Sequence, residues 1–396
     1  MTSDSADLVI GAGPAGLAVA AELTRAGRRP VLLERAERPG ASWLARYDNL
    51  RLNTTRWWSQ LPGMPLPREY GTWVRAADYA KYLDSYARHH ALEIRFGVSA
   101  HRVTADEAGW TVESSAGSMH ASNVVVATGY DRAPFVPPWR GRETFAGLLL
   151  HSSEYRNARP FAGQDVLVVG PGNSGTDIAV DLVRGGAAKV WLSIRTPPQI
   201  VPRTVGRIPT HTFAVAARRL PAWVGDSIVR FLQTVVHGDL SRYGLPRAGG
   251  ALSVQFARGD VVPVIDAAFV REVKRRTVTV VAAVDALAGA GVLLADGSDL
   301  KPDVVIAATG YRRGLESLVG HLGVLDDRGR PVARELPGLF FAGYSNPLSG
   351  NLRELGTEAR SIARELAERS AVQQRRRQTV SVGGIQRRSA NSNRDF

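Results

Sequence analysis

Two short segments of this chain have the glycine spacing that lets a backbone turn hold a pyrophosphate. Residues 11–16 read GAGPAG and residues 170–175 read GPGNSG, so both fit the pattern GxGxxG. In this pattern the first glycine permits a tight turn, the second admits the pyrophosphate, and the third lets a helix pack on a strand. Contacts with cofactors are expected from Gly11, Gly13, Pro14, Ala15 and Gly16, and from Gly170, Gly172, Asn173, Ser174 and Gly175.

The residues around each glycine segment predict the same local structure twice. A single GxGxxG match is weak, because such turns also occur for packing alone. Here each segment follows a short apolar run and precedes a helical stretch and a second apolar run, which is a βαβ unit. The expected elements are strands at 7–10, 30–33, 165–169 and 189–194, and helices that end near residues 25 and 184.

The residues that close the second strand of each unit differ in charge. Glu34 ends the first unit, and its carboxylate can accept hydrogen bonds from a ribose 2′-hydroxyl, which suits the adenosine of FAD. In the second unit the chain reads Ser193, Ile194, Arg195 and Thr196, and Arg195 can pair with a 2′-phosphate. These residues predict NADPH rather than NADH at the second site. The alternative is that Arg195 is a solvated arginine at the end of a strand.

A second repeat supports two nucleotide sites. The run VVVATGY at 124–130 recurs as VVIAATGY at 304–311. Each is a buried strand that ends in a turn of small residues, so it can pass close to a cofactor. Thr128 and Gly129 are therefore candidate cofactor contacts.

The C-terminal region predicts a further element of the first site. A strand at 338–342 leads to Gly343, and residues 351–369 have apolar side chains at helical spacing. The N-terminus of that helix could point at an electron-rich ring edge, as helix dipoles favour. The alternative is a terminal helix that serves packing alone.

The order of these elements predicts an α/β fold with two dinucleotide-binding, Rossmann-like domains, in which the NADP domain is inserted into the FAD domain. The chain would cross between them at 134–161 and again near residue 300. The expected parts are an FAD-binding domain at 1–145 and 300–372, an NADP-binding domain at 160–299 with possible substrate-lid elements at 201–254, and a disordered basic tail at 373–396.

Composition excludes several other classes of protein. The 396 residues include no cysteine, so disulfides, thiolate metal sites and cysteine nucleophiles are excluded, and no metal cluster is expected. The net charge of +13 comes from a body without a basic stripe and from a tail with six arginines, so no nucleic-acid partner is expected. No apolar run reaches the length of a membrane span, and the acidic N-terminus is a poor secretory signal. We expect a cytoplasmic protein without a membrane partner.

A motif between the two glycine segments carries a family resemblance. Residues 145–155 read FAGLLLHSSEY and match the pattern FxGxxxHxxx(Y/F), so the chain resembles the flavin-containing monooxygenases. Baeyer–Villiger relatives have a tryptophan where this chain has Tyr155. His151 lies within the motif, and we favour a structural role for it between the domains over proton transfer.

Further segments are similar to this family over nearly the whole chain. Residues 38–43 (RPGASW) resemble its PGGxW segment, which implies cofactor contacts from Ser42 and Trp43. Residues 50–56 (LRLNTTR) resemble the segment whose asparagine lies beside the flavin and the nicotinamide, which implies such contacts from Asn53 and Thr54. Gly343, which the C-terminal strand reaches, is a further candidate cofactor contact. The stretches at 242–246 and 263–266 resemble the bacterial and plant branch related to auxin-forming enzymes.

The resemblance implies a reaction with dioxygen and a small-molecule substrate. NADPH would reduce FAD, oxidised NADP would stay bound, and dioxygen would form a C4a-(hydro)peroxyflavin that oxygenates a soft nitrogen or sulfur or a carbonyl-bearing carbon. Asn53 would be the catalytic residue, donating its amide to the peroxide or the nicotinamide. The alternative is that Asn53 caps a turn. Trp43, Trp57 and Trp58 could wall the flavin or pack in the core.

Two other functions remain open from the residues alone. One is a flavin-dependent NADPH oxidase or reductase of the same fold, in which the peroxide simply decays. The other is a non-catalytic flavoprotein that uses its basic tail as an interaction arm. Flavin-dependent disulfide reductases are excluded, because the chain has no cysteine.

Overall fold

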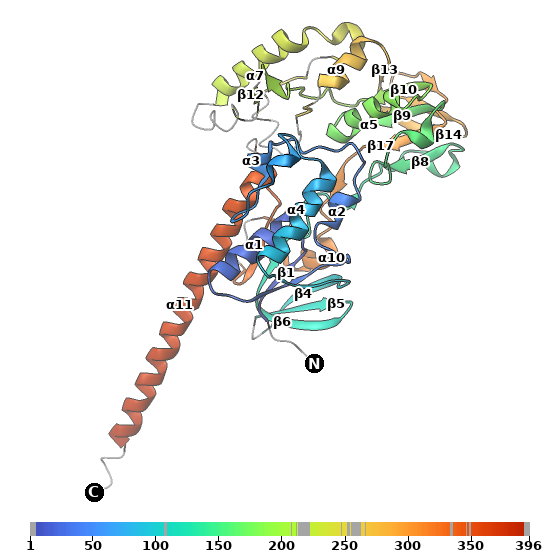
Figure 1. Ribbon diagram of the computed structural model, residues 1–396. Coiled ribbons are helices and arrows are strands. Elements are labelled where there is room, and N and C mark those ends of the chain that lie inside the picture. The colour runs from blue at the N-terminus through green and yellow to red at the C-terminus, as the bar shows by residue number, and fades with distance from the viewer. Residues whose placement is uncertain are drawn as a thin grey trace.

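A computed structural model gives the fold of the chain as two lobes and one long C-terminal helix (Figure 1). The described residues are 5–106, 109–206, 208–210, 212, 222–246, 248–251, 254, 263–265, 267–332, 336–345, 347 and 350–391. Within helices, the side chains of residues 222, 229, 232, 235, 267 and 372–391 are outside the description.

The lower lobe is built on a sheet in the order β3-β2-β1-β6-β5-β4, with β19 also paired to β6. Its strands are β1 (Ser5–Ile10), β2 (Pro30–Leu33), β3 (Glu93–Arg95), β4 (Ala100–Asp106), β5 (Gly109–Ser114), β6 (Gly117–Val126) and β19 (Leu339–Phe341). Strands β3, β2, β1, β6 and β19 are parallel, whereas β4, β5 and β6 form an antiparallel meander.

Successive side chains of the central strand β1 point to opposite faces of this sheet, and both faces are buried. Val9 packs on one face with helices α1 (Pro14–Arg25), α4 (Ala76–His89) and α11 (Asn351–Asn391). Leu8 and Ile10 point to the other face, which packs with α10 (Glu316–Val319). A parallel strand with apolar side chains on both faces must be buried on both faces, and these helices bury it.

The upper lobe is built on a parallel sheet in the order β13-β10-β9-β17-β8. Its strands are β8 (Leu148–His151), β9 (Asp165–Val169), β10 (Lys189–Ser193), β13 (Val278–Val281) and β17 (Val304–Ala307). Helices α5 (Asn173–Arg184) and α9 (Ala267–Lys274) cover one face. A small sheet of β14 (Val284–Ala288), β15 (Gly291–Leu294) and β16 (Asp299–Leu300) covers the other.

The return from the second sheet to the first lies later than the sequence predicted. The expected boundary was near residue 300, but β17 at Val304–Ala307 still pairs with β8 and β9 because its apolar run needs parallel neighbours on both sides. The lobes are then joined by β18 (Tyr311–Arg312), which pairs with β7 (Ala133–Pro134).

The expected lid region at 201–254 is only partly described. Within it lie β11 (Thr204–Val205), β12 (Ile208–Pro209), helix α7 (Ala222–His237) and the short helix η4 (Ser241–Tyr243). Residues 207, 211, 213–221, 247 and 252–253 are outside the description, so part of the expected aromatic helical patch falls there. In Figure 1, α7 lies at the outer edge of the upper lobe.

Helix α11 differs from the sequence-based expectation. The sequence predicted a helix at 351–369 and a disordered tail from residue 373, whereas the backbone of α11 is helical to Asn391. The glutamines and arginines at 373–378 are good helix formers, so they allow the helix to continue past Ser370, whereas Gly383 and Gly384 disfavour a helix. Among the described residues, no helix has both the length and the apolar character to cross a membrane.

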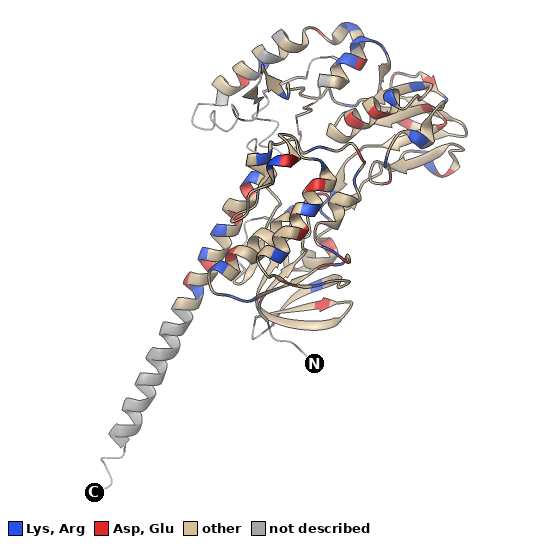
Figure 2. Cartoon of the chain, in the orientation of Figure 1, with Lys and Arg blue, Asp and Glu red and all other residues tan. Residues whose placement is uncertain are grey.

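The remaining short helices lie in connections. They are α2 (Ala41–Leu44), α3 (Arg56–Ser59), η1 (Arg68–Tyr70), η2 (Arg142–Thr144), η3 (Arg159–Phe161) and η5 (Gly320–Leu322). In the view of Figure 2, basic and acidic residues of the described chain are interspersed over both lobes rather than gathered in a stripe.

Candidate functional site

The first glycine turn has no room for side chains at two of its three glycines. A Cβ on Gly11 would lie 2.5 Å from the carbonyl oxygen of Ala127, and one on Gly16 would lie 1.9 Å from that of Gly11. A Cβ on Gly13 would meet nothing within 4 Å. Gly13 therefore faces open space at the N-terminus of α1, which is where backbone N–H groups and the helix dipole favour a pyrophosphate.

The second turn repeats this geometry on β9 and α5. A Cβ on Gly170 would lie 2.5 Å from the carbonyl oxygen of Ala308, and one on Gly175 would lie 1.9 Å from that of Gly170. A Cβ on Gly172 would again meet nothing within 4 Å. Both turns thus fit a dinucleotide.

Glu34 lies at the end of β2, beside the first turn. Its Oε2 accepts a hydrogen bond from the Ala12 amide at 2.8 Å, and its Oε1 accepts one from the Ala36 amide at 2.9 Å. These bonds hold the half-buried carboxylate in a single orientation. Each carboxylate oxygen can accept a further bond, so Glu34 can still bind a ribose hydroxyl.

Arg195 lies beyond the end of β10, in a shallow pocket of about 370 Å³ that Pro197, Gly244 and Pro246 also line. Its exposed guanidinium is available to an anion, while Thr196 is exposed outside this lining. Asp296 lines the same pocket, and hydrogen bonds from Ser298 lower the pKa of its carboxyl. The pocket therefore places one cation and one carboxylate around the predicted 2′-phosphate position.

Asn53 has a free side-chain amide. It lies half-buried in the loop before α3, and neither its amide nitrogen nor its amide oxygen has a hydrogen-bond partner among the described residues. Thr54 beside it shares a hydrogen bond with the Ser59 hydroxyl at 2.6 Å. This bond fixes the loop and leaves the amide available, in contrast to the alternative of a turn-capping asparagine.

The start of α11 lies against this loop and against the first glycine turn. A Cβ on Gly350 would lie 2.5 Å from Thr54 Cγ2, and one on Gly343 would lie 2.8 Å from Ala15 Cβ. Glu358 holds this arrangement by accepting a bond from the Gly343 amide at 2.8 Å. The N-termini of α1 and α11 and the Asn53 loop therefore lie next to one another, where the sequence predicts the flavin dinucleotide.

The segment with Trp43 lies beside the first glycine turn. Gly40, at φ +63°, donates its amide to the carbonyl of Ala12 at 3.0 Å, which ties the segment to the glycine turn. The Trp43 ring contacts the buried Tyr79 edge-to-face at 4.8 Å, and Ser42 is exposed. Trp43 thus packs on the core beneath the site.

The other two tryptophans of this region differ from each other. Trp57 is 42% exposed, while the guanidinium of Arg353, in the first turn of α11, lies 5.0 Å from the centroid of the Trp58 ring. Trp58 therefore helps to position the start of α11.

Thr128 has a partner that the sequence did not reveal. Its hydroxyl shares a hydrogen bond with the Tyr344 hydroxyl at 2.8 Å, and its amide donates to the same oxygen at 3.2 Å. Gly129, at φ +98°, follows in the turn and has open space where a Cβ would be. Tyr344 directly follows Gly343, and that neighbour was the one available signal.

Asn173 and Ser174 lie at the start of α5, beside the open side of the second turn. Both also form hydrogen bonds with other parts of the protein. Asn173 donates to the Pro263 carbonyl at 3.1 Å and accepts from the Ile265 amide at 3.1 Å. A hydrogen bond from Ser174 to Tyr47 contributes to the environment of that phenol. Asn173 thus orders the 263–265 segment beside the turn.

His151 connects the strands of the upper lobe to the crossover between lobes. The ring is buried, and its two nitrogens lie 2.9 Å from the Ser153 hydroxyl and 3.1 Å from the Gly310 carbonyl. Burial lowers the pKa of His151, so the ring is neutral and Nε2 donates to Gly310. These contacts agree with the expected structural role.

Side chains that could hold a metal do not cluster in the described part of the chain. No group of three or more His, Asp or Glu side chains there is placed to bind a metal ion.

Comparisons with known proteins place this geometry in a family. Residues 8–205 match the family model described as pyridine nucleotide-disulphide oxidoreductase. The rice (Oryza sativa subsp. japonica) indole-3-pyruvate monooxygenase YUCCA1 is 36% identical over 330 residues, which cover 81% of this chain and 80% of that protein. The Arabidopsis thaliana probable indole-3-pyruvate monooxygenase YUCCA3 is 31% identical, with 91% and 86% covered.

Solved structures share the fold over most of the chain. The flavin-containing monooxygenase from Stenotrophomonas maltophilia superposes with a TM-score of 0.70 at 24% identity, covering 93% of this chain and 100% of that one. An oxidised steroid monooxygenase bound to NADP superposes with a TM-score of 0.73 at 17% identity, covering 93% and 87%.

Fold and comparisons together define an enzyme of the flavin-dependent monooxygenase class, with two dinucleotide-binding folds. The chain belongs to the flavin-containing monooxygenase family. The cofactors expected from Glu34 and Arg195, FAD and NADPH, are those that this family uses.

Proposed function

We propose that this enzyme uses NADPH and FAD to transfer one oxygen atom of dioxygen to a carbonyl-bearing carbon of a small molecule, such as a 2-oxo acid. The free amide of Asn53 beside the start of α11 carries the proposal, because a half-buried amide without a partner is available to a reacting group. The curated relatives named as indole-3-pyruvate monooxygenases support a 2-oxo acid.

The first turn and its surroundings would hold FAD. The open side of Gly13 would take the pyrophosphate, and Glu34 would accept from the ribose. The N-terminus of α11 would lie at the electron-rich edge of the ring, where a helix dipole stabilises negative charge. When bound, FAD reduced by NADPH supplies the activation of dioxygen.

The second turn would hold NADPH. The open side of Gly172 would take its pyrophosphate, and the exposed guanidinium of Arg195 would pair with the 2′-phosphate. Asn53 would donate its amide at the point where flavin, nicotinamide and substrate meet.

The test is a comparison of substrates under steady-state turnover. FAD-loaded enzyme is given NADPH and dioxygen with indole-3-pyruvate, with thioanisole or with N,N-dimethylaniline, and NADPH loss, peroxide release and oxygenated product are measured. The proposal predicts product formation that matches NADPH loss with indole-3-pyruvate. Preferential turnover of the sulfide or the amine would shift the function to soft nucleophiles. Stoichiometric peroxide with every compound would show an NADPH oxidase.

A matched pair of variants tests the role of Asn53. Asn53→Ala removes the amide and is expected to lower product per NADPH at least tenfold, whereas Gln60→Ala, which removes an exposed amide seven residues later, is expected to retain most product. An unchanged ratio in Asn53→Ala would contradict the assignment.

A further inference from the structure

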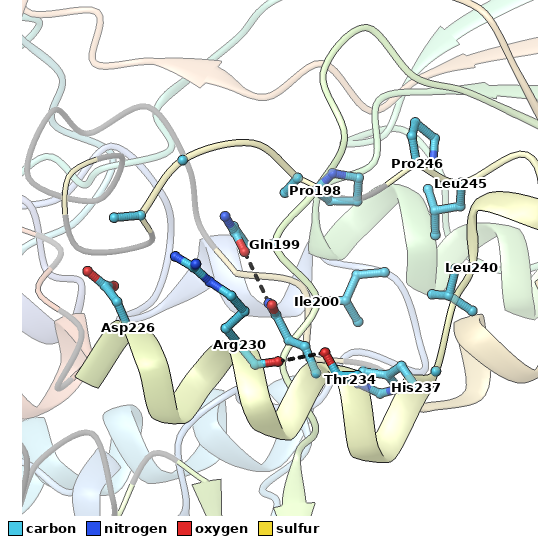
Figure 3. Close-up of a pocket in the computed structure, with 15 residues that line it drawn as sticks. Pro198, Gln199, Ile200, Asp226, Arg230, Thr234, His237, Leu240, Leu245 and Pro246 are labelled. Atoms are coloured by element: carbon cyan, nitrogen blue, oxygen red, sulfur yellow. Dashed lines mark hydrogen bonds between the residues drawn. The ribbon is translucent and has the colours of Figure 1, made fainter. Parts of the chain in front are cut away.

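A cavity of about 380 Å³ lies in the upper lobe, and none of the predicted cofactor-contact residues lines it. One wall is helix α7 (Ala222–His237), and the floor consists of buried apolar side chains at the edge of the second core (Figure 3). The apolar floor residues are Ile200, Leu240 and Leu245, with Pro198 and Pro246 beside them. This volume is in the range of small-molecule sites.

Helix α7 turns its polar side toward the cavity. Asp226, Arg230, Gln233, Thr234 and His237 line it, and their spacing of three and four residues places them on one face. An amphipathic surface helix usually buries its apolar stripe instead. A polar stripe directed inward indicates a ligand that needs polar contacts.

Three described apolar side chains of α7 point away from the cavity and are exposed. Ile228, Phe231 and Val236 have relative exposures of 44%, 66% and 45%. Burial of these three side chains therefore does not determine the orientation of the helix.

His237 gives independent support for a ligand. The residue is 4% exposed and lines the cavity, and its Nε2 has no hydrogen-bond partner among the described residues. Burial, and then the charge of Lys274, lower the pKa of His237, so its ring is neutral. A buried polar atom without a partner is unfavourable, and a ligand atom could satisfy it.

Arg230 supplies the charge that selects the ligand. Its side chain reaches from α7 toward the segment that carries Gln199, as Figure 3 shows. Gln199 accepts a hydrogen bond from Gln233 at 3.0 Å, so the amides there bond to each other. The Arg230 guanidinium has neither an ion pair nor a hydrogen bond with any described residue, and it faces the cavity beside an apolar floor.

We propose that this cavity is a binding site for an organic monoanion with an apolar body, whose carboxylate pairs with Arg230 while its body packs on Ile200, Leu240 and Leu245. A polar atom of the ligand would reach His237. Asp226, one turn before Arg230, disfavours a dianion. The site is distinct from the Asn53 loop but shares Pro246 with the Arg195 pocket, so it adjoins the predicted NADPH site.

Calorimetric titration tests the site without turnover. FAD-loaded enzyme saturated with NADP⁺ is titrated with 3-phenylpropionate, 3-phenylpropionamide and 3-phenylpropylamine. The proposal predicts one site per chain for the carboxylate, at least tenfold weaker binding of the amide, and still weaker binding of the amine. Equal affinities, a preference for the amine, or no binding at 5 mM carboxylate (about tenfold above a 0.5 mM Kd) would overturn it.

Variants locate the binding. Arg230→Gln is expected to weaken 3-phenylpropionate binding at least tenfold, Arg230→Lys to weaken it less, and His237→Phe to weaken it several-fold. The charge-matched control Arg271→Gln, at an exposed position of α9 outside the cavity, is expected to leave it unchanged. Equal weakening by Arg271→Gln would overturn the assignment, as would unchanged binding in Arg230→Gln.

Asn53→Ala separates this site from the flavin edge. It is expected to leave the Kd of 3-phenylpropionate unchanged, and the probe is expected to leave the flavin absorbance spectrum unchanged. A large effect of Asn53→Ala on this Kd would place the probe at the flavin and overturn the proposal. Because the readout is binding, the result is independent of whether the enzyme oxygenates a 2-oxo acid.

Discussion

The Tyr47 hydroxyl donates a hydrogen bond to Asp177 Oδ2 at 2.7 Å, across 130 residues of sequence. Tyr47 lies in the loop that leads to Asn53, and Asp177 lies in the first turns of α5. One helical turn later, Asp181 accepts bonds from Asn49 and Tyr155, each at 2.6 Å. The flavin-side loop is therefore fastened to the helix whose N-terminus faces the predicted NADPH site.

Tyr47→Phe is expected to loosen this link. Removing one hydrogen bond of about 0.5–1.5 kcal/mol should raise the KM for NADPH about three- to tenfold and increase peroxide release per NADPH, with a smaller change in kcat. Steady-state kinetics with a peroxide assay measure this. The control is Tyr70→Phe, because the Tyr70 hydroxyl has no hydrogen-bond partner among the described residues. This variant should leave the KM for NADPH and the peroxide released per NADPH unchanged. If Tyr47→Phe lowers the Tm but leaves the KM for NADPH and the peroxide released per NADPH unchanged, Tyr47 has only a structural role.

Gly13→Ala and Gly172→Ala should separate the two cofactors. Each glycine has negative φ (−79° and −71°), and an added Cβ would meet no protein atom within 4 Å, so both variants should fold. The new methyl group would instead occupy the expected pyrophosphate position. Gly13→Ala should be purified with much less flavin.

Gly172→Ala should retain its flavin and lose affinity for NADPH. Flavin absorbance per protein and the KM for NADPH are the two measurements. The same defect in both variants would contradict the assignment of one cofactor to each turn.

Arg195→Ala should abolish the preference for NADPH. Loss of a charge-assisted contact of about 1.5–3 kcal/mol corresponds to a 10- to 150-fold higher KM for NADPH, with little change for NADH. Arg184→Ala, at the exposed end of α5, is the charge-matched control. Equal effects on both nucleotides would exclude a phosphate contact for Arg195.

Arg28→Ala should destabilise the lower lobe. Arg28 forms a two-bond ion pair with Asp7, at 2.5 and 2.7 Å, and also donates to Ser370 of α11 at 2.6 Å. Asp7 is 1% exposed, so removal of its cation leaves a buried charge, at a cost of about 3–5 kcal/mol in the free energy of unfolding. Urea unfolding measures the loss. The control is Arg29→Ala, at the exposed neighbouring position, which should change the free energy of unfolding little.

His151 should make the fold less stable in acid. Burial lowers its pKa in the folded state from the ordinary value of 6.5, so the unfolded chain binds this proton more readily. Its effect is absent well above pH 6.5 and grows as the pH falls below that value, by at most about 1.4 kcal/mol per pH unit. His151→Gln should therefore show a shallower loss of urea stability between pH 7.5 and 5.5 than the unchanged protein. Equal slopes would contradict the shift.

The sequence alone determined the features that depend on neighbours in the chain. Strand, glycine turn and helix follow one another within about 30 residues, the length of a βαβ unit, so both turns and the positions of Glu34 and Arg195 could be predicted from spacing. The structure confirms the two βαβ units and parallel sheets.

Only the tertiary structure decided the relationships between distant segments. The bond from Tyr47 to Asp177, the pairing of Thr128 with Tyr344, and the place of β17 in the second sheet all join residues far apart in sequence. The orientation of α7, whose polar face lines the cavity, was also decided by the tertiary structure. The sequence pattern shows that a helix has a polar and an apolar face, but not which of them packs against the rest of the protein. Such contacts depend on how whole elements pack, and local spacing contains no information about that packing.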